Sequence, residues 1–127
     1  MCFIVDPSNR GRIRTATKPI TVYKFLEKKV VRGKICWVSP YWYKQYPIGK
    51  VLRVRTLLKG RHSSWVTNQI LIERGLHAYT TRAKARAYTA SWSDRYPFVA
   101  VIPKGAKYRI NRQNEVVSTA LKVVKPL

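Results

Sequence analysis

The chain has 127 residues, of which 46% are hydrophobic and 12% aromatic, so its composition fits one domain with a core and excludes a disordered tail. It carries 26 Lys and Arg against five Asp and Glu, a formal charge of +21, which excludes the mixed-sign surface of an ordinary soluble domain. No segment approaches the ~20 continuous apolar residues of a membrane span, and Asp6-Pro7 interrupts the apolar start too early for a signal-peptide core.

The first part of the chain predicts a basic arm or loop over residues 1–18, followed by one compact domain over residues 19–127. The run Arg10-Gly11-Arg12-Ile13-Arg14 contains glycine and follows turn-forming residues. Cations are not confined to it, since 15 lie in residues 1–64 and 11 in residues 65–127. The positive charge therefore covers the whole chain and is not a detachable tail.

Several segments have the composition of β-strands. β-Branched and aromatic residues predict a strand over residues 19–26, and a hairpin is expected to join Val30-Val31 to residues 35–38. Alternation of apolar and basic residues over 51–57 predicts a half-buried strand with Arg53 and Arg55 pointing outward. Residues 39–47 are aromatic and bounded by prolines, so we expect an ordered loop there. Further strands are expected at 98–102, 108–110 and 121–124, and the apolar residues 70–72 lead into a turn at Glu73-Arg74-Gly75.

One principal helix is predicted over about residues 81–92. Thr80 or Thr81 caps its start, residues 82–88 have high helix propensity, and the stretch from Asp94 to Pro97 ends it. The predicted fold class is α+β, a mostly antiparallel β-sheet with this one helix.

The sequence contains few residues that could support catalysis or bind a metal ion. The five acids form no obvious pair, and no glycine-rich phosphate loop is present. Cys2 and Cys36 have no metal-like spacing with the histidines, so we expect two reduced thiols, no metal and no cofactor. His77 and Tyr79 lie directly before the helix, where they are candidates to face a cleft. The simpler interpretation is a histidine that hydrogen-bonds the backbone.

The charge favours a polyanionic partner. At this size, the self-repulsion of +21 is on the order of 10 kcal/mol after physiological screening, comparable with a net stability of ~5–15 kcal/mol. No reader motif for base sequence is present, so contacts to a nucleic-acid backbone are expected. The predicted anion-binding residues are Arg10, Arg12, Arg14, Lys34, Lys44, Lys50, Arg53, Arg55, Arg82, Lys84 and Arg86.

Aromatic residues lie among the cations of residues 34–50. Exposed rings stack on bases, whereas buried rings pack a core or a protein interface, and the sequence favours neither interpretation. The residues concerned are Trp37, Tyr41, Trp42, Tyr43 and Tyr46.

Three short motifs resemble a group of small uncharacterised proteins from phages and other large DNA viruses, with bacterial relatives. They are Ile20–Lys24 (ITVYK), Gly75–Thr80 (GLHAYT) and Ile102–Tyr108 (IPKGAKY), with Ala85, Ser118 and Leu121 completing the pattern. The resemblance implies a viral context and supplies no catalytic residues. This chain is far more basic than such proteins, which suggests a place near a packaged genome or within a charged particle.

A more distant likeness connects the early Tyr-Lys strand and the late Ile-Pro-Lys-Gly turn with ADP-ribosyltransferase-type domains. Those enzymes use an arginine or histidine early and a glutamate late, where this chain has Lys24 and Glu115 in poorly matching places. An enzyme of that kind, or one centred on His77, is the least favoured alternative.

The sequence therefore predicts a non-catalytic, strongly basic protein that binds a polyanion, with nucleic acid, DNA or RNA, as the first candidate. A structural component of a virion, such as a minor capsid or internal protein docking on acidic protein surfaces, is the alternative. Either role places it in the host cytoplasm or nucleus, or in the virion.

Overall fold

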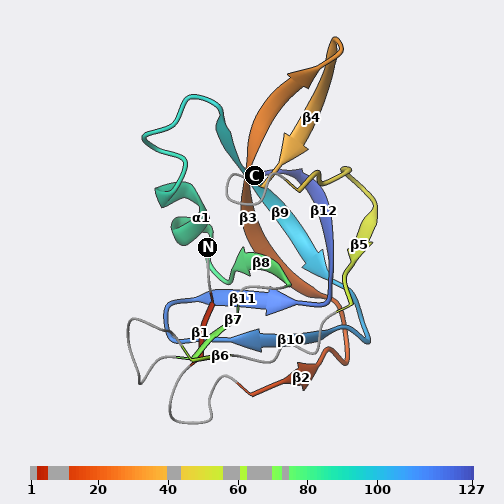
Figure 1. Ribbon diagram of the computed structural model, residues 1–127, viewed down its shortest axis with the longest axis vertical. Coiled ribbons are helices and arrows are strands. Elements are labelled where there is room, and N and C mark those ends of the chain that lie inside the picture. The colour runs from red at the N-terminus through yellow and green to blue at the C-terminus, as the bar shows by residue number, and fades with distance from the viewer. Residues whose placement is uncertain (1–2, 6–11, 40–43, 56–60, 63–69, 73–74) are drawn as a thin grey trace.

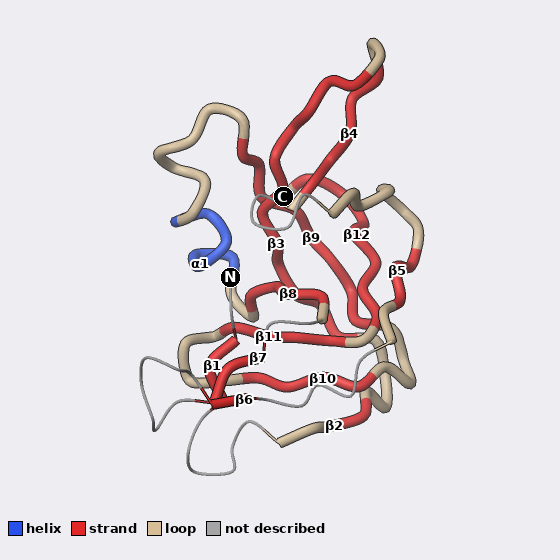
Figure 2. The backbone as a smooth tube through the Cα atoms, in the orientation of Figure 1, coloured by secondary structure: helices blue, strands red, loops and turns tan. Residues whose placement is uncertain are grey.

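The computed structural model describes residues 3–5, 12–39, 44–55, 61–62, 70–72 and 75–127. Strands dominate this part of the chain, and one short helix accompanies them (Figure 2). The strands are β1 (Phe3–Val5), β2 (Arg14–Thr15), β3 (Ile20–Val31), β4 (Lys34–Val38), β5 (Val51–Arg53), β6 (Arg61–His62), β7 (Ile70–Ile72), β8 (Leu76–Tyr79), β9 (Arg95–Ile102), β10 (Lys107–Ile110), β11 (Glu115–Ser118) and β12 (Ala120–Pro126). The helix is α1 (Arg82–Ala87). The prediction of a mostly antiparallel sheet with one helix is confirmed for the described residues.

A nine-stranded sheet carries most of the structure. Its strand order is β2-β10-β11-β8-β3-β9-β12-β5, and β4 pairs with the outer half of β3. A second sheet of three strands has the order β1-β7-β6. All the described pairings are antiparallel. The longest one joins β3 to β9 from Ile20↔Ile102 to Glu27↔Arg95.

The large sheet bends sharply where β8 meets β3. These two strands share one residue pair, Tyr23↔Tyr79, and the strands on either side of it cross in space. In Figure 1, β3, β9 and β12 run steeply, whereas β8, β11 and β10 run across the view. The main core fills the angle between the two halves, with Leu26, Phe98 and Leu121 from one half and Leu76 and Val116 from the other. This is an orthogonal packing of two sheet layers.

The other face of β3 is covered by α1. Phe25 of β3, Tyr79 of β8 and Ala85 of α1 form a second buried cluster, against which Tyr23 packs. Successive residues of a strand point to opposite faces, so β3 contributes Val22, Lys24 and Leu26 to the main core and Phe25 to the α1 side. This one strand therefore has apolar side chains buried on both faces.

The helix is shorter than predicted. It begins after Thr81, whose side chain accepts the Lys84 N–H as expected for an N-cap, but it ends at Ala87 and not near residue 92. Thr89 ends it, because both its N–H and its hydroxyl donate to the Arg86 carbonyl. Thr89, Ser91 and Ser93 favour turns over helix interior, whereas the prediction gave more weight to the alanines before them.

The segment expected to be an arm or loop contains two short strands. β2 pairs with β10 through Lys107↔Thr15 and Tyr108↔Arg14, and β1 pairs with β7. Ala16, two residues beyond Arg14, is buried in the main core. The backbone therefore pairs with the sheets at these points, which corrects the prediction of an arm or loop. The local sequence could not indicate these pairings because the partner strands lie far along the chain.

Two strands that the sequence pattern did not predict are fully buried. All four side chains of β8 and all four of β11 are buried, and the two strands pair with each other. A strand covered on both faces shows no alternation of apolar and polar residues, which is the signal used for prediction. The strand predicted over 51–57 is shorter, because β5 ends at Arg53 and residues 56–57 lie outside the described residues. The expected alternation is present over residues 51–55, with Arg53 and Arg55 exposed and Leu52 and Val54 packed against the core.

The predicted hairpin around Arg32-Gly33-Lys34 is present and stands clear of the rest of the chain in Figure 1. Arg32 and Gly33 form a two-residue turn and both have positive φ, 52° and 77°. A turn with positive φ at both central residues matches the right-handed twist of the flanking strands. The strands expected at 19–26 and 30–31 are one continuous strand, because β3 passes from pairing with β9 to pairing with β4 at Glu27.

We expect Gly33→Ala to destabilise the hairpin by about 1 kcal/mol through its positive φ alone. Nothing lies within 4 Å of the position that a Cβ would occupy, so no clash contributes. Faster amide hydrogen exchange at Val31 and Lys34 measures the effect. Gly33→Asn, which tolerates positive φ, serves as the matched control and should lose less; equal losses in the two variants would contradict this explanation.

Candidate nucleic-acid interface

The few acids are withdrawn from the described surface. Glu27 and Glu115 are buried and Asp94 is half-buried, whereas every lysine and arginine whose side chain is described, except Lys24, is exposed or half-buried. Glu27 lies 2.7 Å from Lys29, and Glu115 accepts a hydrogen bond from the Asn111 amide at 3.0 Å. Within the described residues, the surface is therefore even more one-sided in charge than their composition.

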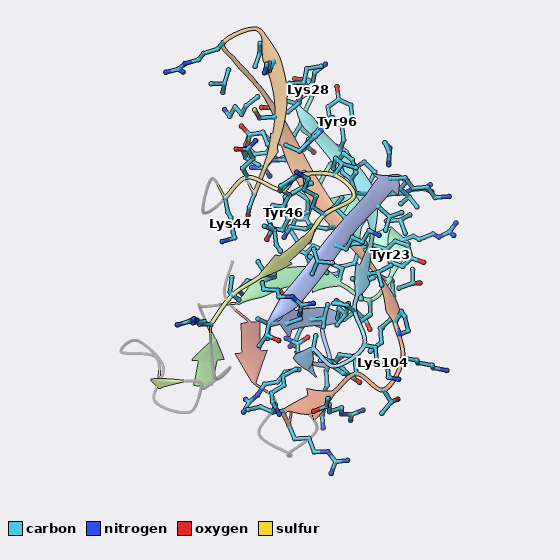
Figure 3. The ribbon with its side chains drawn as sticks, turned by 90° about the vertical axis from the view of Figure 1, so that its right-hand side faces the viewer. Tyr23, Lys28, Lys44, Tyr46, Tyr96 and Lys104 are labelled. Carbon is cyan, nitrogen blue, oxygen red and sulfur yellow. The ribbon has the colours of Figure 1, made fainter. Side chains whose placement is uncertain are left out.

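The predicted anion-binding cations are distributed over several elements and form no single patch. Those that are exposed are Arg12, Arg14, Lys34, Lys44, Lys50, Arg53, Arg55, Arg82 and Arg86; Lys84 is half-buried, and Arg10 lies outside the described residues. β2 and β5 hold opposite edges of the large sheet. Figure 3 shows nitrogen-tipped side chains on the hairpin, on the flanks and at the lower end near Lys104.

The predicted aromatic segment does not provide an exposed stacking surface where it is described. Tyr46 is buried in the main core, and Trp37 packs against it with its ring 4.9 Å from Phe98 in an edge-to-face contact. Tyr41, Trp42 and Tyr43 lie outside the described residues. Core packing, one of the two interpretations left open, therefore holds for Trp37 and Tyr46.

Exposed rings occur instead beside α1, in a surface that we call the aromatic–arginine face. It consists of Tyr23, Arg82, Tyr88, Trp92 and Arg95, and the buried ring of Phe25 contacts Tyr88 and Arg95 from below. Tyr88 stacks on Phe25 at 5.4 Å and keeps 37% of its surface exposed, and Trp92 is 54% exposed. The Arg95 guanidinium lies 3.8 Å from the Trp92 ring centroid and 5.5 Å from that of Phe25.

A second pair within this face joins Arg82 to Tyr23. Their guanidinium and ring lie 5.7 Å apart, and Arg82 Nε donates to the Tyr23 hydroxyl at 3.5 Å. Guanidinium groups held against rings keep their charge and their outward N–H groups, so they remain able to meet phosphates. Cations and partly exposed rings thus alternate on one surface, the arrangement that single-stranded nucleic acids bind.

The hairpin is the second distinctive surface. Its exposed cations are Lys28, Lys29, Arg32 and Lys34, and its exposed apolar side chains are Val30 (67%), Val31 (53%) and Ile35 (56%). Lys28 N–H donates to the Asp94 carbonyl at 2.8 Å, so the loop that carries Trp92 is attached to the base of the hairpin. The hairpin and the aromatic–arginine face are therefore neighbours.

One lysine is inside the protein. Lys24 points into the main core, where Nζ donates to the His77 carbonyl and lies 4.6 Å from the Tyr46 ring centroid. Burial lowers the pKa of Lys24 to about 7, because removing an ammonium group from water disfavours its charged form. Burial likewise raises the pKa of Tyr46. The nearby ring and carbonyl stabilise the ammonium only in part.

His77 and Tyr79, the candidates to face a cleft, both have buried side chains in β8. His77 is paired in register with Val117, and Tyr79 stacks at 5.3 Å on Tyr88. Glu115, in register with Tyr79, is engaged by Asn111. These residues pack between strands and under α1, in positions that suit structural roles.

Within the described residues, no group of three or more His, Cys, Asp or Glu could hold a metal ion. In the same part of the chain, no helix is long and apolar enough to span a bilayer. The sequence matches no family model, and no curated protein or solved structure matches it. The viral resemblance therefore stays a prediction that rests on its three motifs.

The sequence did contain weak signals for the surface residues that the prediction missed. Trp92 lies between serines and an aspartate, a polar setting in which a large ring is rarely buried. Val30 and Val31 lie between pairs of cations at a glycine turn, which favours a hairpin tip over a core. Nothing in the sequence indicated that the Arg95 guanidinium would lie over the Trp92 ring, since this contact depends on the turn that ends α1.

The buried ammonium predicts a specific pH dependence of stability. Lys24 has a folded pKa near 7 and an unfolded pKa near 10.5, so unfolding takes up a proton between these values. The loss of folding stability caused by burying the Lys24 ammonium is complete below pH 7 and disappears above about pH 10.5. Relative to Lys24→Met, which has no ammonium, the wild-type protein should therefore gain stability as pH rises from 7 to 10, by at most about 5 kcal/mol.

Chemical denaturation of both proteins at several pH values measures this difference and cancels the titration of groups that they share. Lys24→Met should be the more stable protein at pH 7. A difference that does not change between pH 7 and 10 would show that Lys24 keeps an ordinary pKa in the folded protein.

Proposed function

We propose that this protein is a non-catalytic binding protein for nucleic acid, held mainly by contacts to phosphates and aided by exposed rings. The observation that carries the proposal is the separation of charge, with the described acids buried or half-buried and the described cations, apart from Lys24, exposed or half-buried. Phosphates spaced along a nucleic acid neutralise many such cations at once and release condensed counterions. In a virus, the partner would be the genome or its transcripts.

Docking on acidic protein surfaces within a virion would neutralise the same cations. The aromatic–arginine face favours nucleic acid, because rings next to guanidinium groups fit bases next to phosphates. An acidic protein would use Arg82 and Arg95 as ion-pair partners, and rings beside arginines also occur in protein–protein interfaces. Direct binding of isolated oligonucleotides that weakens on removal of an aromatic ring therefore distinguishes the two partners.

We expect tight binding to unrelated DNA and RNA sequences, with a steep dependence on salt. With about 6–10 phosphate contacts, affinity should fall ~10³–10⁵-fold between 50 and 200 mM salt. Fluorescence anisotropy with labelled oligonucleotides measures the slope. Absence of binding at 50 mM salt would exclude this function, and a flat salt response would indicate an apolar interface.

Trp92→Ala should weaken binding to single-stranded DNA roughly 5- to 100-fold, the range for loss of one stacked base. Trp92→Phe keeps a flat ring and should retain most of the affinity, which makes it the matched control. The ring is 54% exposed, so neither change removes core packing. Unchanged affinity in Trp92→Ala would restrict the interaction to phosphates.

A further inference from the structure

The β3–β4 hairpin presents different side chains on its two faces. Val30 is directly opposite Ile35, and Lys28 is directly opposite Trp37, so these four side chains share one face. Val31 and Lys34 form a pair on the other face. Trp37 is anchored at 5.5 Å against Tyr96, which lies beside the hairpin base near Lys28 in Figure 3. The apolar pair thus extends outward from a packed aromatic base.

More than half of each residue of this apolar pair is exposed to water, so a partner that covers the pair would gain by removing apolar surface from water. Val30 and Ile35 are 67% and 56% exposed, more than any other large apolar side chain described, with Trp92 at 54% and Val31 at 53% next. Cations surround the pair along the chain, with Lys28 before it and Arg32 and Lys34 at the turn. Whatever covers the pair must therefore offer apolar contacts with negative charge on both sides.

We propose, resting on the nucleic-acid function above, that the hairpin is a ribbon that enters the major groove of duplex DNA. A B-form major groove is about 12 Å wide and admits two strands that lie about 4.8 Å apart. Val30 and Ile35 then face the base edges, where thymine methyl groups offer apolar contact. The long side chains of Lys28, Arg32 and Lys34 reach the phosphates that border the groove.

Other occupants fit the hairpin less well. A second copy of this chain would bring Lys28, Arg32 and Lys34 against like charges of a +21 molecule. A lipid bilayer would have to receive Arg32 first, because the turn and not the apolar pair is the outermost point. The major groove of A-form RNA is deep and narrow, so the ribbon would be excluded from double-stranded RNA.

The test compares a duplex DNA of about 20 base pairs with double-stranded RNA of the same sequence, using anisotropy and dimethyl sulfate. This reagent modifies guanine N7 in the major groove and adenine N3 in the minor groove. We expect wild-type protein to bind the DNA more tightly and to protect guanine N7 alone. The double variant Val30→Thr with Ile35→Thr keeps β-branching and should bind roughly tenfold more weakly, without that protection.

Matched controls come from the same molecule. Val51→Thr with Val124→Thr alters two valines that are 40% and 38% exposed elsewhere in the sheet, and should bind like wild type. Lys28→Gln with Lys34→Gln should reduce the salt slope by about 1.8, the value for two lost phosphate contacts. Lys18→Gln with Lys104→Gln, at exposed positions away from the hairpin, should not change it. Thermal melts verify that each variant folds.

The outcomes separate this inference from the function on which it rests. Full DNA affinity and guanine protection in the Val30/Ile35 variant, or equal binding to double-stranded RNA, would overturn the groove assignment and leave nucleic-acid binding intact. A hairpin variant that keeps DNA binding but loses binding to vesicles of anionic lipid would assign the hairpin to membranes. Failure of the wild-type protein to bind any nucleic acid would remove both proposals.

Discussion

Uncompensated positive charge is the constraint on which the rest of this structure depends. With 26 cations and five acids, at least 21 cations have no acidic side chain to pair with, wherever the chain folds them. Within the described residues the fold offsets little of this imbalance, because Glu27 and Glu115 are buried, Glu27 in an ion pair with Lys29 and Glu115 accepting a hydrogen bond from the Asn111 amide. Repulsion among the remaining cations opposes the compact state, and an external polyanion relieves it.

One strand connects the core with both candidate binding surfaces. β3 places Leu26 in the main core and Phe25 under α1, and then continues past Glu27 as one side of the hairpin. Its pairing with β9 fixes Arg95 opposite Glu27, next to the rings of the aromatic–arginine face. One central strand, paired with β9 and β4, therefore positions both surfaces.

The buried ammonium group of Lys24 destabilises the core electrostatically. Its contacts with the His77 carbonyl and the Tyr46 ring replace only part of the hydration that an ammonium group loses on burial, so its pKa falls to about 7. A chain already burdened by surface repulsion thus also has a destabilising group inside. Both costs make the fold sensitive to solution conditions, the surface through salt and the core through pH.

The sequence by itself determined the charge, the antiparallel class, the alternation over residues 51–55, the Arg32-Gly33 hairpin and a threonine cap at Thr80 or Thr81, because each follows from composition or from neighbours along the chain. The structure selects Thr81 as the cap. Only the tertiary structure decided that β8 and β11 are buried strands, that α1 ends at Ala87 and that Trp37 and Tyr46 pack inside. It also decided that Trp92 and Arg95 meet outside. Burial of a ring or a strand depends on partners distant in sequence, and the local sequence pattern does not indicate which partners these are.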